Sequence, residues 1–149
     1  MQASVVSGMT GVTWLSSNAW AYPALEVLHI LGIALMLGSL VLVELRVWGL
    51  GAELPVQPLA RLGLTVSVLG FCLIAASGLA LFAAHPAEML ANRSFVIKMG
   101  LVMMAGLNAA QFHARGSLAK ADRTARVQTL LSMGLWLGAI ICGRWIAYL

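Results

Sequence analysis

Four long apolar stretches dominate the sequence and limit what the chain can fold into. Each has roughly the 20 residues that a helix needs to cross the hydrocarbon core of a bilayer. They cover residues 23–48, 61–84, 94–114 and 127–148. Because backbone polar groups must be satisfied within lipid, spans of this length predict helices rather than barrel strands. We expect an all-α integral membrane four-helix bundle, forming a single transmembrane domain over residues 1–149.

The composition agrees with a membrane protein. Charged residues make up 9% of the chain and hydrophobic residues 61%, whereas soluble domains carry about 25% charged residues. No basic run with interleaved aromatic residues is present, so we expect no nucleic-acid partner. Trp14, Trp20 and Tyr22 precede the first span and predict a short interfacial N-terminal segment, because their rings favour the headgroup level. The first 22 residues lack a basic leader region, and no signal cleavage is expected.

The positive charges predict an orientation in the membrane. Four spans place both termini on one side, and three Lys or Arg residues belong to that side: Arg93, Lys98 and Arg144. The two loops of the opposite side and their flanks hold six: Arg46, Arg61, Arg115, Lys120, Arg123 and Arg126. The positive-inside rule therefore predicts a multi-pass protein with both termini outside. In a bacterial inner (cytoplasmic) membrane they would be periplasmic.

A few ionisable side chains lie inside the spans, where they are functional candidates by default. His29 and Glu44 are 15 residues apart in the first span, and Lys98 and His113 are 15 apart in the third. Fifteen helical steps leave about 60° of rotation and a separation of roughly 22 Å. Because these spans run in parallel, we predict two layers. A terminal-side layer contains His29, Lys98 and Arg144, and a loop-side layer contains Glu44 and His113.

This spacing excludes one haem held between His29 and His113, because axial ligands lie within about 4 Å of each other in depth. One histidine with a different sixth ligand, or two cofactors in separate layers, would fit. Structural roles are the alternatives. Either histidine could hydrogen-bond a neighbouring helix, and Glu44 could pair with Arg46 or Arg61. The cations of the terminal-side layer could extend to the headgroups.

Small residues four apart allow close helix packing. Gly106 with Ala110 and Gly134 with Gly138 have this spacing. Such pairs suit packing within the bundle or a homo-oligomer, and the sequence alone does not separate the two.

Several motifs together resemble a known family. They are AWAYPALEVLHILGIALMLGSLVLVELRVWGLG, SGLALFAAHP, NRSFVIKMGLVMMAGLNAAQFH and GRWIAYL. They resemble an uncharacterised family of short bacterial four-helix membrane proteins, a domain of unknown function. More distantly, the layout is similar to the haem-binding four-helix protoporphyrinogen oxidase and to copper-resistance D-type membrane proteins. Similarity to the oxidase implies that His29, followed by Gly32, is an axial haem ligand and that Lys98 partners a carboxylate or propionate. It does not extend to His113 or Glu44.

The leading hypothesis is a b-type haem-binding protein of the inner membrane that transfers electrons within the bilayer. A quinone or a redox protein would be its partner. His29 would ligate iron, Glu26 would orient its other ring nitrogen, and Gly32 would leave room for the macrocycle. Lys98 and Arg144 would neutralise the propionates.

Other functions remain open at this point. His113 and Glu44 could form a second cofactor site on the loop side. A tetrapyrrole oxidase of the protoporphyrinogen type could use the same scaffold. A copper- or proton-handling transporter could use His29, Glu44 and His113.

Overall fold

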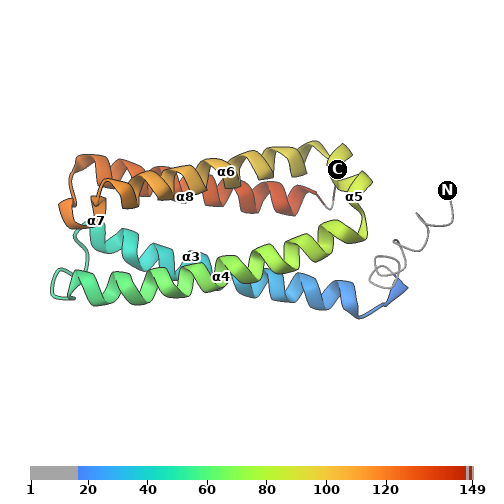
Figure 1. Ribbon diagram of the computed structural model, residues 1–149, viewed down its shortest axis with the longest axis horizontal. Coiled ribbons are helices and arrows are strands. Elements are labelled where there is room, and N and C mark those ends of the chain that lie inside the picture. Colours follow the sequence, from blue (N-terminus) through green and yellow to red (C-terminus); the bar gives the residue numbers. More distant parts are fainter. Residues whose placement is uncertain (1–16, 147, 149) are drawn as a thin grey trace.

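The computed structural model describes residues 17–146 and residue 148, and it is built from helices (Figure 1). The long helices are α3 (Ala21–Val47), α4 (Val56–Ala84), α6 (Arg93–Ala114) and α8 (Arg123–Trp145). All four are long and apolar enough to cross a membrane, which confirms the all-α four-helix prediction. Two short helices, α5 (Pro86–Ala91) and α7 (Ser117–Lys120), lie in connections that we expected to be loops. The expected interfacial segment lies largely outside the described residues.

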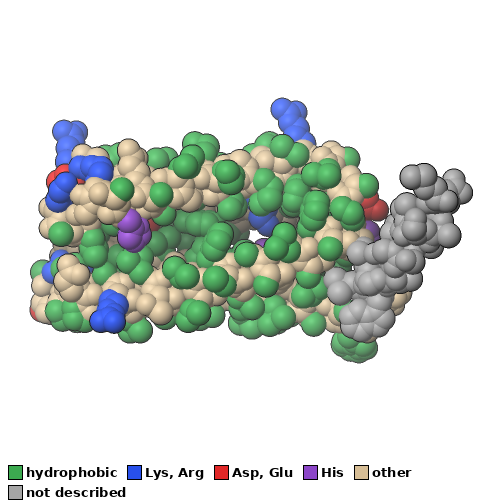
Figure 2. Space-filling view, in the orientation of Figure 1, with side chains coloured by type: hydrophobic (Ala, Val, Ile, Leu, Met, Phe, Trp, Pro, Cys, Tyr) green, Lys and Arg blue, Asp and Glu red, His purple; other side chains and the backbone are tan. Residues whose placement is uncertain are grey.

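The helices form two hairpins. Helix α3 packs along α4, α6 packs along α8, and the hairpins meet mainly through α3 and α8. Figure 1 shows α3 and α6 running in the same direction, as the four-span topology predicts. Figure 2 shows apolar side chains over the exposed faces and a furrow between the hairpins, in which histidine and cationic side chains are visible. Some of the ionisable side chains therefore lie between the hairpins.

Close backbone contact through glycine holds α3 against α4. A methyl group at Gly32 would lie 2.9 Å from the Gly70 carbonyl oxygen, and one at Gly70 would lie 2.6 Å from the Met36 backbone nitrogen. The expectation that Gly32 leaves room for a macrocycle is wrong, because the α4 backbone already fills the space beside it. Gly32 is a packing residue of the first hairpin.

In the second hairpin, only some of the small residues spaced four apart contact the neighbouring helix. A methyl group at Gly138 would lie 3.2 Å from a Leu101 methyl carbon, so Gly138 packs within the hairpin. Gly106 and Gly134 have no such neighbour within 4 Å, and Ala110 is exposed. The structure thus assigns Gly138 to packing within the chain and leaves the other three small residues on its outer surface.

The connections are fixed by backbone geometry and capping. Gly49 and Gly51 adopt positive φ values of 95° and 63° in the turn after α3, a region that glycine enters without strain. Pro55 precedes α4, and Pro58 lies in the first turn of that helix. Proline is tolerated there because first-turn N–H groups have no intrahelical acceptor. Asn92 caps α6 by accepting from the Ser94 and Phe95 amides.

Candidate functional site

On the terminal side, a hydrogen-bond chain fixes the protonation of His29. Its Nδ1 lies 3.0 Å from Ser77 Oγ, and Ser77 Oγ donates to the Leu73 carbonyl at 2.6 Å. A serine hydroxyl has one hydrogen, and that hydrogen is committed to the carbonyl. Nδ1 of His29 must therefore carry a hydrogen and donate it to Ser77. The Nε2 nitrogen keeps its lone pair, which is the form of imidazole that binds metals.

Two glycines make room for this layer. A methyl group at Gly78 would lie 3.2 Å from Cε1 of His29, and one at Gly143 would lie 3.4 Å from Nζ of Lys98. The imidazole thus lies against α4, and the lysine side chain lies across α8. Lys98 is close enough to His29 to interact with it electrostatically. His29 and Lys98 thus lie within electrostatic range of each other in one layer.

Two other residues expected here have different surroundings. Arg144 is exposed, donates from Nη2 to the Tyr148 hydroxyl at 2.7 Å and lies 5.0 Å from the centre of that ring. Glu26 is exposed on α3, and Ser77 occupies the role expected of it beside His29. Of the two cations, Lys98 rather than Arg144 is therefore the one that interacts with the imidazole.

On the loop side, Glu44 and His113 line the same small cavity, of about 50 Å³. His113 donates from Nδ1 to the Ala109 carbonyl at 2.8 Å, because a carbonyl can only accept. In the neutral ring, this bond leaves the lone pair on Nε2. Glu44 is 7% exposed, and the Ser132 hydroxyl lies beside its carboxyl group. The spacing argument correctly anticipated that Glu44 and His113 share a layer.

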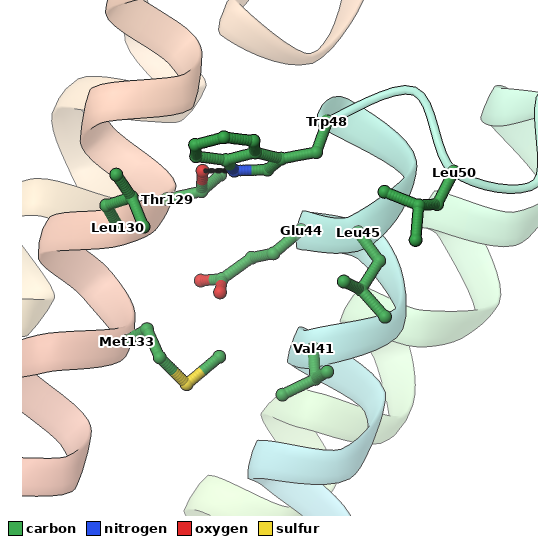
Figure 3. Close-up of a pocket in the computed structure, with 8 residues that line it drawn as sticks. All are labelled: Val41, Glu44, Leu45, Trp48, Leu50, Thr129, Leu130 and Met133. Carbon is green, nitrogen blue, oxygen red and sulfur yellow. Dashed lines mark hydrogen bonds between the residues drawn. The ribbon is translucent and has the colours of Figure 1, made fainter.

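Glu44 also reaches a second, larger cavity between α3 and α8, of about 280 Å³ (Figure 3). Its carboxylate points into the space between the Trp48 indole and the Met133 thioether. Trp48 Nε1 donates to Thr129 Oγ1 at 2.9 Å, and Thr129 Oγ1 donates to the Arg126 carbonyl at 2.8 Å. This chain fixes the indole as one wall of the cavity. The remaining lining is apolar: Val41, Leu45, Leu50 and Leu130.

The structure does not support a pairing of Glu44 with either neighbouring arginine. Arg46 turns to the loop that follows α3, where Nε donates to the Leu54 carbonyl at 3.1 Å and Nη2 to the Ala52 carbonyl at 3.2 Å. Arg61 is exposed on α4. Across residues 17–146 and 148, Arg115 forms an ion pair with Asp122, and the His85 imidazole lies 3.7 Å from the Glu88 carboxylate. Glu44 takes part in neither.

Sequence reasoning missed the residues that support the ionisable side chains. Ser77 follows His29 by 48 positions, and Thr129 follows Trp48 by 81. Their only sequence signal is a small hydroxyl side chain within an apolar span. Between residues 17 and 146 and at 148, no three His, Cys, Asp or Glu side chains come close enough to hold a metal ion.

Comparison with known proteins adds no assignment. No protein-family model matches the chain, and neither a curated protein nor a solved structure matches it significantly.

Proposed function

We propose that the protein binds b-type haem in a bacterial inner membrane and transfers electrons within the bilayer. The observation that carries the proposal is the hydrogen-bond chain from His29 through Ser77 to Leu73, from which the tautomer of His29 follows. Its Nδ1–H is held by Ser77, so Nε2 presents a lone pair. Metal-ligating histidines in general donate their other ring nitrogen to a fixed acceptor in this way.

The surroundings of His29 suit a haem better than a bare metal ion. The macrocycle supplies four ligands of its own, so one or two side chains suffice, whereas the described residues offer no cluster of three ligands. The bound iron would supply one-electron redox chemistry. Lys98 brings an ammonium group into the same layer, and haem propionates are anionic groups that demand such donors. The furrow between the hairpins gives access from the membrane (Figure 2).

The experiment is an absorption spectrum of the protein purified in mild detergent from haem-replete cells, before and after addition of dithionite. We expect a Soret band and an α band that sharpens on reduction. His29→Ala should lose these bands. His113→Ala is the matched control, because it removes the other imidazole with a free Nε2 and leaves the terminal-side layer intact.

The outcomes separate one site from two. Full loss of the bands in His29→Ala with full retention in His113→Ala assigns a single terminal-side haem. Partial loss in each variant assigns one haem to each layer. A colourless wild-type protein would overturn the proposal. Stopped-flow absorbance then measures whether a quinol reduces the haem-loaded protein. Reduction would favour a quinone as the redox partner, and its absence would favour a protein.

A further inference from the structure

The Glu44 cavity combines a buried carboxylate with an aromatic wall and an apolar lining. Glu44 is 7% exposed, its carboxylate points into the cavity, and the Trp48 indole forms a wall beside it (Figure 3). The opening is bordered by exposed apolar side chains, including Leu45, Leu50 and Leu130. The cavity therefore opens toward the lipid side of the molecule.

Among the described residues, Glu44 takes part in neither of the acid–base pairs. Its polar neighbour is the Ser132 hydroxyl, which is neutral, and the nearby Arg46 is engaged by two loop carbonyls. His113, in the adjoining cavity, has its Nδ1–H engaged by the Ala109 carbonyl. A carboxylate removed from water is costly unless it is protonated or paired with a cation. A cation that entered this cavity would supply the missing charge.

We propose that the cavity between α3 and α8 binds a lipophilic organic cation of the substituted-ammonium class. The carboxylate of Glu44 binds its charge, and the Trp48 indole contacts its alkyl or aryl surface, since aromatic rings attract such cations. Apolar walls favour a ligand with little hydration, which argues against an inorganic cation. The volume of about 280 Å³ suits a compact ligand with one ring or a few short alkyl groups. The site is separate from His29, and the proposal does not rest on haem binding.

The test uses radiolabelled benzyltrimethylammonium in equilibrium dialysis against the whole protein in a neutral detergent. We expect saturable binding by the wild type that Glu44→Gln weakens by about tenfold or more, because a charged interaction is replaced by a neutral one. Glu26→Gln is the matched control. It removes the same charge from the same helix at an exposed position, and its affinity should stay within about twofold of the wild type.

A pair of substitutions at Trp48 tests the aromatic wall. Trp48→Leu should weaken binding by about fivefold, whereas Trp48→Phe, which keeps a ring, should lose less. Neopentylbenzene, the neutral carbon isostere of the probe, should fail to displace it at equal concentration. Displacement by this isostere would mean that the cavity selects shape without charge, and it would overturn the proposal.

A second measurement covers the case in which Glu44→Gln fails to fold. A hydrophobic carbodiimide modifies carboxyl groups in apolar sites, and mass spectrometry locates the adduct in the wild-type chain. The probe should slow modification of Glu44 and leave the rate at Glu26 unchanged. An unchanged rate at Glu44, or no saturable binding by the wild type, would overturn the proposal. Loss of probe binding in phosphatidylcholine but not in phosphatidylglycerol vesicles would overturn a free organic cation as the ligand, because the choline headgroup of a lipid would then occupy the site.

Discussion

At the scale of single residues, His29 and His113 share one feature that the sequence does not reveal. Both donate from Nδ1, one to a serine hydroxyl and one to a carbonyl of its own helix, so in the neutral ring the lone pair of each lies on Nε2. They lie toward opposite ends of parallel helices, and Glu44, which shares a cavity with His113, is roughly 22 Å from His29 along α3. Spacing along a helix was sufficient to predict these layers. The acceptor of His29 comes from another helix, and a single sequence does not give the contact between them.

Ser77 is the residue whose removal tests the orientation of His29. Ser77→Ala should retain haem but bind it about 10- to 100-fold more weakly, as is typical when the partner of a ligating histidine is lost. The measurement is haem titration of the apoprotein followed by absorbance, with Ser77→Thr expected to restore affinity. Ser67→Ala is the control, because Ser67 is buried in the same helix ten residues from Ser77. If Ser77→Ala bound haem as tightly as the wild type, Ser77 would have no role in the haem site.

Asp122 gives a pH-dependent prediction outside the membrane. Its carboxylate accepts from the Ala125 amide at 2.8 Å and from Arg115 Nη2 at 3.2 Å, and these contacts, the amide first, lower the pKa of Asp122 below its ordinary value. A lowered pKa means that the contribution to stability is complete above the ordinary value of about 4 and is lost as the pH falls through the lowered pKa. Thermal unfolding followed by circular dichroism should show this loss.

The control for Asp122 is its amide. Asp122→Asn keeps an oxygen that can accept from the Ala125 amide, since asparagine is a good N-cap, but it no longer titrates. Its unfolding temperature should therefore vary less between pH 6 and pH 2 than that of the wild type. An identical pH dependence in both proteins would place the acid sensitivity elsewhere in the chain.

At the scale of helices, hydropathy predicted the four spans but placed two of their starts too late. Helix α4 begins at Val56 rather than at 61, and α8 begins at Arg123 rather than at 127. The first turns contain polar or proline residues, and hydropathy marks the lipid core rather than the end of the helix. Asp122, as N-cap, is the local signal that sets the true start of α8. The two short helices escaped prediction because they have only six and four residues.

Two glycines of α3 provide a matched test of hairpin packing. Gly32→Ala would bring a methyl group to 2.9 Å from the Gly70 carbonyl oxygen, whereas Gly38 has nothing within 4 Å. We expect Gly32→Ala to destabilise the protein by about 1–3 kcal/mol through overpacking. Gly38→Ala should be neutral or slightly stabilising, because alanine favours a helix. Unfolding in mixed micelles of increasing SDS content measures both, and equal stabilities would contradict the close α3–α4 contact.

At the scale of the whole molecule, pairing into two hairpins explains why the functional candidates collect between them. Close glycine contacts hold α3 to α4, and Gly138 lies against Leu101 between α6 and α8, whereas the hairpins meet mainly through α3 and α8. The larger cavity lies on this one seam. The sequence predicted which residues share a layer, but it gave no sign of which helices pair tightly. That pairing depends on which glycines face a neighbouring backbone, and Gly32 and Gly38 look alike in sequence.

The orientation of the bundle is the prediction that concerns the entire chain. Most of its cations belong to the α3–α4 and α6–α8 connections, and of the remaining three, Lys98 lies across Gly143 within the bundle. A lysine within the bundle does not count as a loop charge, so Arg93 and Arg144 are the cations left on the terminal side. The difference between the two sides is therefore larger than six against three, which favours termini outside more strongly. In a bacterial host, alkaline phosphatase fused to the C-terminus should therefore be active, and a fused green fluorescent protein should be dark. A reporter inserted at Glu53, in the exposed α3–α4 turn, should give the reverse pattern. A fluorescent C-terminal fusion would instead place the terminal-side layer, with His29 and Lys98, toward the cytoplasm.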